Sequence, residues 1–124
     1  DRARCEQWVS AINAYVDGPF IRRYVLQYVF PKGADGKPDR ATIDAAVREM
    51  PDKFAILDRA YGGRDFLVGK ALSMADLFLA PILFYVEMFP EGKVLLPKYS
   101  NVMRGQAVIR ERASYKETMP PIGA

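Results

Sequence analysis

The chain has 124 residues, of which half are hydrophobic, 27% are charged and 12% are aromatic. This length and apolar fraction suffice for one domain with a sizeable core, and they exclude a second domain and bulk disorder. The 18 lysines and arginines are interleaved with 15 acidic residues, so the net charge of +3 builds no field that would attract nucleic acid.

The residue inventory narrows the chemistry further. The single cysteine, Cys5, cannot form an internal disulfide and no apolar signal region is present, so we expect a cytoplasmic protein. The longest apolar run, 77–86, is about half of the roughly 20 residues that a membrane span needs. Without histidine, Ser-His and Cys-His nucleophile pairs and the usual zinc sites are excluded, and we expect no metal. Because a helical pattern is under way from Asp1 onward, we also expect a preceding segment.

The first two predicted elements are long helices. Apolar residues at spacings of three and four predict one helix over 5–30, with a kink at Pro19, whose ring removes an amide donor. After a Gly- and Pro-rich loop, the same spacing predicts a second helix over 39–61. Its apolar stripe stays in phase across Pro51, so this helix is expected to bend rather than divide.

The third helix is predicted from a start signal followed by an apolar run. Ser73 and Asp76 have the spacing of a capping box, and Leu72 can pack on Leu77 as a hydrophobic staple. The alternative, a nucleophile beside a carboxylate, lacks a base between the two groups. The helix, over about 73–89, is apolar on nearly every side and is therefore expected to be the central buried helix.

The remaining helices are shorter. No helix is predicted over 90–97, and 100–112 reads as a weaker helix because Gly105 costs about 1 kcal/mol relative to alanine. A last short helix begins with the capping-box spacing of 114–117, and the prolines at 120–121 end it. Five helices without a strand predict an all-α bundle.

The motifs closely resemble the glutathione transferase C-terminal domain, in which this capping box and staple open the central helix. The residues that carry the resemblance are Phe66-Leu67-Val68-Gly69, Leu72-Ser73-Met74-Ala75-Asp76-Leu77, Tyr99-Ser100-Asn101-Val102 and Arg112-Ala113-Ser114-Tyr115. The resemblance implies a five-helix orthogonal bundle around the helix at 73–89, as a single domain over 1–124. Where the family often has an aromatic residue, near Gly105, this chain departs from the pattern.

The resemblance also implies a function. In the family, an N-terminal thioredoxin-like domain binds glutathione and carries the Tyr, Ser or Cys that activates its thiol. The helical domain supplies the pocket for the apolar electrophile and much of the homodimer surface. We therefore expect glutathione as co-substrate of a complete detoxifying enzyme, no catalytic residue and no bound cofactor in this domain alone, and an inactive isolated chain.

Four residues of the first helix are candidates for the substrate pocket. Asn13, Asp17, Phe20 and Tyr24 are spaced four, three and four apart, so they would line one helix face. A pocket with apolar walls and a few polar groups suits a small apolar ligand. The alternative for Phe20 and Tyr24 is a place in the core, and Cys5 is expected to act as a small hydrophobe.

A second function is compatible with the same sequence. Helical domains similar to those of glutathione transferases also occur as assembly units in translation factors and synthetase complexes. The chain could therefore be a non-catalytic protein-interaction module.

Overall fold

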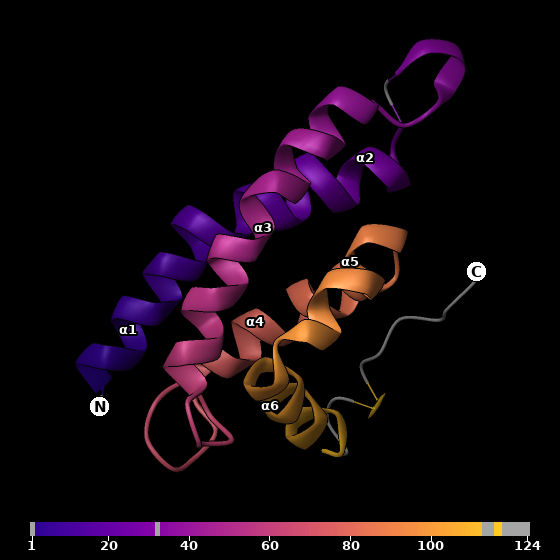
Figure 1. Cartoon of the computed structure of the whole chain (residues 1–124). Helices are drawn as coiled ribbons and strands as arrows, with labels where there is room; N and C mark the ends of the chain where they lie inside the picture. The colour runs from indigo at the N-terminus through magenta and orange to yellow at the C-terminus, as the bar shows by residue number, and fades with distance from the viewer. Residues whose placement is uncertain (1, 32, 113–115, 118–124) are drawn as a thin grey trace.

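The computed structural model describes residues 2–31, 33–112 and 116–117, and within them the chain is helical and has no strand (Figure 1). This confirms the predicted all-α class. The helices are α1 (Arg2–Ala11), the π-helical η1 (Ile12–Val16) and η2 (Gly18–Val25), α2 (Leu26–Val29), the 3-10 turn η3 (Ala34–Gly36), α3 (Arg40–Tyr61), α4 (Met74–Glu87), α5 (Pro90–Leu95), the 3-10 turn η4 (Leu96–Lys98) and α6 (Ser100–Arg110). The start of the last predicted helix lies outside the described residues, and so does the tail at 118–124.

The first predicted helix is one continuous helical run over 2–29, which we call the N-terminal helix. A kink is predicted at Pro19, and at this position the structure shows a change of helix type. Pro19 lies in η2, and most of 12–25 is wound as π-helix instead of α-helix. Because a proline cannot donate an α-helical hydrogen bond, the wider turns around it keep the helix continuous where a break would leave carbonyls unpaired.

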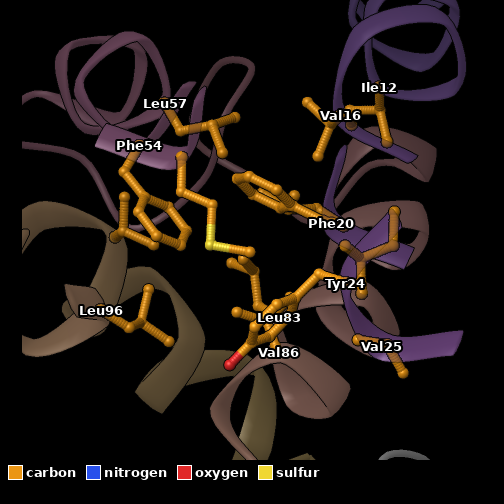
Figure 2. Close-up of a cluster of buried hydrophobic side chains, with 14 of the residues drawn as sticks. Ile12, Val16, Phe20, Tyr24, Val25, Phe54, Leu57, Leu83, Val86 and Leu96 are labelled. Atoms are coloured by element: carbon orange, nitrogen blue, oxygen red, sulfur yellow. The ribbon is translucent and has the colours of Figure 1, made fainter. Parts of the chain in front are cut away.

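The π-helical turns align one buried stripe along the N-terminal helix. Ile12, Val16, Phe20 and Tyr24 follow one another at every fourth residue and are all buried (Figure 2). In an α-helix of about 3.6 residues per turn, a four-residue step overshoots a full turn by roughly 40°, so three steps would carry the stripe about 120° around the helix. Wider turns absorb this overshoot. We call these four residues the core stripe.

The second helix, α3, runs without interruption through Pro51, as predicted. Asp39 caps it: Oδ1 accepts a hydrogen bond from the Thr42 amide at 3.3 Å and Oδ2 from the Thr42 hydroxyl at 2.9 Å. The helix ends at Gly62, whose φ of 55° suits glycine. The predicted apolar stripe is buried against the N-terminal helix, and its fully buried members are Ile43, Ala46, Met50, Phe54, Leu57 and Tyr61.

The predicted capping box opens α4. The Asp76 side chain accepts from the Ser73 amide at 3.0 Å, and the Ser73 side chain accepts from the Asp76 amide. Asp76 is fully buried, and its other oxygen accepts from the Leu67 amide at 3.0 Å. The carboxylate therefore ties the preceding loop to the start of the helix, which a capping box alone does not do.

The segment after α4 corrects the expectation that 90–97 contains no helix. It forms α5 and η4, with Pro90 at the start of α5, where its missing amide costs nothing. Gly92 packs so closely on the end of α4 that a Cβ there would lie 1.9 Å from the Val86 carbonyl oxygen. Only glycine fits this crossing.

The predicted weaker helix forms as α6, and its stripe of Val102, Gln106 and Ile109 is buried. Asp58 of α3 caps it, because its Oδ1 accepts from the Asn101 amide at 2.9 Å and from the Val102 amide at 3.1 Å.

Gly105 lets α6 approach α3 closely. A Cβ at this position would lie 2.3 Å from Cε1 of the buried Tyr61 ring. The glycine that lowers helix propensity is the residue that permits the packing.

Candidate functional site

The four side chains predicted to line a pocket do not share one environment. Asn13 is exposed, and Asp17 is half-buried and accepts from Arg22 Nε at 3.1 Å. Phe20 and Tyr24 are fully buried. The structure therefore separates a surface pair, Asn13 and Asp17, from a core pair, Phe20 and Tyr24, and the binding role of all four stays a prediction.

The register of the π-helical turns explains the separation. Spacings of four, three and four share a face only where every turn is α-helical, and η1 and η2 replace that geometry over 12–25. The core pair consequently joins the core stripe. The Phe20 ring centroid lies 4.8 Å from that of Phe54, and Tyr24 points into the same cluster (Figure 2).

Polar groups from three helices converge on Glu91, the second residue of α5. The Tyr24 hydroxyl donates to Glu91 Oε1 at 3.2 Å and accepts from the Gly92 amide at 3.0 Å. The Tyr28 hydroxyl donates to Oε1 at 2.6 Å, and Arg40 donates to the Tyr28 hydroxyl at 2.9 Å and to Glu91 Oε2 at 3.3 Å. This Glu91 cluster joins the end of the N-terminal helix to the starts of α3 and α5.

The cluster keeps its acid charged and its phenols protonated. Partial burial disfavours the carboxylate, but the hydrogen bonds from Tyr28 and Tyr24 and the charge of Arg40 outweigh it and hold the pKa of Glu91 below its usual value. Burial and the bond to Glu91 raise the pKa of Tyr28 above its usual value. The Tyr28 phenol is thus a poor candidate for a catalytic base. We interpret the Glu91 cluster as a structural contact between helices.

The Glu91 cluster should make stability depend on pH. Because the pKa of Glu91 is depressed by folding, its contribution is present above the unfolded pKa and is lost as the pH falls through the folded pKa. Glu91→Gln should therefore cost about 1 to 2 kcal/mol at neutral pH and progressively less in acid. Denaturant midpoints across this pH range measure the difference. Asp44→Asn, which changes a more exposed partner of Arg40, is the control, and a cost that does not vary with pH would contradict the assignment.

An apolar groove lies between the N-terminal helix and α3. It encloses about 220 Å³, and its lining residues are Trp8, Ala11, Tyr15, Val16, Lys53, Ile56 and Leu57. Tyr15 is 65% and Ile56 46% exposed, and Lys53 Nζ lies 5.4 Å from the centre of the Tyr15 ring. We call this hollow the α1/α3 groove.

The outer side of α4 is also apolar. The helix buries one side in the core, but Met74, Leu77 and Phe78 are 53%, 46% and 40% exposed, and Pro81 on the next turn is exposed as well. We call these four residues the α4 face. The expected central helix is thus covered on one side only within the described residues. The staple between Leu72 and Leu77 stays a prediction. Exposed apolar side chains on successive turns of one helix make this face a candidate contact surface.

Cys5 behaves as predicted, half-buried against the core. It borders a hollow of about 270 Å³ that Arg2 shares with the loop residues from Val68 to Ser73. Among the residues that the structure describes, no three metal-ligating side chains gather, and no helix is long and apolar enough to cross a membrane.

The helical fold, the capped α4 and the exposed apolar faces define the class of this protein. It is an all-helical domain with apolar surface open to contact. Residues 20–104 match the family described as glutathione S-transferase, C-terminal domain. The chain belongs to this family.

Solved structures with the same fold are glutathione transferases. The chain is 26% identical to poplar glutathione transferase F1, with a TM-score of 0.81 over 94% of this chain and 52% of that one. A glutathione S-transferase from Methylobacillus flagellatus with GSH bound shares the fold, with a TM-score of 0.75 at 23% identity over 97% of this chain and 57% of that one. The chain thus spans about half the length of these structures.

One relative is named as an elongation factor. The chain is 30% identical over 78 residues to a probable elongation factor 1-gamma of Caenorhabditis elegans, a match that covers 63% of this chain and 18% of that protein.

Proposed function

We propose that the chain is the helical domain of a cytoplasmic glutathione transferase and supplies the pocket for an apolar electrophile. A thioredoxin-like domain of the complete protein would bind glutathione and activate its thiol. The observation that carries the proposal is the α4 face: the helix opened by the family's capping box exposes an apolar side that a second domain can cover. The family membership and the glutathione transferase neighbours support the same assignment.

The start of the N-terminal helix lies close to the start of α4. Arg2 and Ser73 border the same hollow, so the beginning of the N-terminal helix lies beside the residue that caps α4. A domain joined ahead of Arg2 would therefore begin near the loop that precedes α4. Covering Met74 and Leu77 of the α4 face would remove apolar surface from water. This burial is favourable by about 25 cal/mol per Å².

The catalytic contribution of this domain would be proximity. By holding an electrophile against a thiolate from the other domain, it would convert a bimolecular encounter into an oriented one. A thiolate is the reactive form, so lowering the thiol pKa would fall to the other domain. The isolated chain would be inactive, and the complete protein would act in detoxification.

The α1/α3 groove would serve the homodimer. It is apolar, open and formed by the first two long helices, and an apolar side chain of a second copy would fill it. An isologous contact of this kind is the commonest way in which subunits pair.

The experiment compares the complete gene product with the helical domain. We expect glutathione conjugation to an aryl halide in the complete protein and none in residues 1–124 alone. Phe78→Ser on the α4 face should weaken domain docking, so activity and melting temperature fall in the complete protein, while the isolated domain is no less stable. Val94→Ser is the matched control, because Val94 is 64% exposed and lies on α5 instead of α4. Equal effects of the two variants would contradict docking on α4.

A non-catalytic module is the second candidate, and the similarity to a probable elongation factor 1-gamma favours it. On this alternative the complete gene product would bind other proteins of translation and would conjugate no electrophile. The activity assay therefore separates the two functions.

A further inference from the structure

We propose that Asp35 is a site of spontaneous covalent modification, at which aspartate rearranges to isoaspartate in the folded protein. The sequence contains two Asp-Gly pairs, Asp17-Gly18 and Asp35-Gly36. An aspartate that precedes glycine is especially reactive, because glycine has no side chain to hinder attack by its own backbone nitrogen. The structure places the two identical pairs in different surroundings, and this difference selects Asp35.

The rearrangement needs no reagent other than water. The backbone nitrogen of Gly36 attacks Cγ of Asp35, and the new N–Cγ bond closes a five-membered succinimide. The amide proton leaves with the carboxyl hydroxyl as water. A water molecule then adds to one of the two ring carbonyls. Cleavage of the N–Cγ bond restores aspartate, whereas cleavage of the bond from nitrogen to the original main-chain carbonyl carbon leaves the chain running through the side chain, as isoaspartate.

Ring closure requires rotation about the Cα–C bond of Asp35. The ψ of 28° holds the Gly36 nitrogen on the side of this bond away from Cβ, so the nitrogen must swing round before it can reach Cγ. This rotation has little to break. Asp35 is exposed in the short turn η3, and the Gly36 amide donates to the Gly33 carbonyl oxygen at a long 3.3 Å. An exposed turn with so few bonds opens at a low free energy.

The other pair is held by the N-terminal helix. Asp17 has α-helical angles, a φ of −57° and a ψ of −43°, and its amide donates to the Ile12 carbonyl oxygen. Val16 and Phe20, close to it on the helix, belong to the buried core stripe. The Asp17 carboxylate also accepts from Arg22 Nε at 3.1 Å. Rotation at Asp17 would therefore require the helix to unfold and the core stripe to open.

The test ages the complete gene product near neutral pH and measures isoaspartate at each site by peptide mapping with electron-transfer fragmentation. In the folded protein, isoaspartate should form at least about tenfold faster at Asp35 than at Asp17, and in guanidinium chloride the two rates should become similar. The tryptic peptide that carries Asp35 also carries Asp39, which precedes Arg40 instead of glycine. Asp39 is thus an internal reference and should remain aspartate.

Matched asparagine variants give a second readout. Asp35→Asn and Asp17→Asn would form the same succinimide with loss of ammonia, and hydrolysis then converts the amide to an acid, a mass change that is followed on the intact protein. Deamidation should be fast in Asp35→Asn and slow in Asp17→Asn while both stay folded. Equal rates at the two sites in the folded protein, or no isoaspartate at Asp35, would overturn this inference. A difference that persists in guanidinium chloride would overturn it as well, because neighbours in the sequence, not the fold, would then set the rates.

Discussion

Replacing Asp76 by alanine should lower the free energy of unfolding by about 3 kcal/mol. The carboxylate is fully buried and accepts from three donors, the Ser73 amide and hydroxyl and the Leu67 amide. Alanine would remove the acceptor and leave the Leu67 amide with no partner in the interior. Denaturant unfolding measures the loss, which should exceed that of an ordinary helix cap.

Ser73→Ala gives the comparison within the same capping box. It should cost about 1 kcal/mol, since it removes the cap but leaves the bond between Asp76 and Leu67. The double variant should cost less than the two single changes together, because the side chains act on each other. Equal costs for the two single variants would mean that the Leu67 contact contributes nothing.

Gly105→Ala should destabilise the domain by about 2 kcal/mol, although alanine favours a helix by about 1 kcal/mol over glycine. The added Cβ would lie 2.3 Å from the Tyr61 ring, and Tyr61 is held in α3 with no exposed surface into which it could move. Overpacking therefore outweighs propensity. The change in melting temperature tests the sign of the effect, which propensity alone would reverse.

Gly18→Ala is the matched control for this substitution. Its Cβ would meet only Arg23 Nη2, at 3.7 Å, so the gain in helix propensity should stabilise the domain by roughly 0.5 to 1 kcal/mol. Combining Gly105→Ala with Tyr61→Leu should cost less than the sum, because the second change makes room for the first. A stabilising Gly105→Ala would contradict the contact with Tyr61.

The sequence predicts those features that depend on neighbours along the chain. The continuous helix through Pro51 follows from the phase of an apolar stripe, and the capping box follows from the spacing of Ser73 and Asp76. Both are confirmed, because each rests on geometry within a few residues. The short helix α5 was not predicted, although Pro90 stands at its start, where the missing amide costs nothing.

The candidate site depends on features that local spacing does not contain. Tyr24 reaches a partner 67 residues away in Glu91, and no periodicity in either segment indicates that pairing. The separation of Asn13 from Phe20 depends on how the helix is wound around Pro19. Reading 3.6 residues per turn through that stretch placed surface and core residues on one face.

The π-helical turns also decide how the N-terminal helix runs past its neighbours. An apolar repeat of 3.5 residues wraps helices around one another with a left-handed supercoil, and a repeat of about 3.67 residues gives a right-handed one. A repeat of four residues would demand far stronger right-handed coiling from a regular α-helix. By widening its turns instead, this helix keeps the core stripe on one side, and it packs against α3 mainly through η2. The winding of the backbone thus replaces the coiling of whole helices.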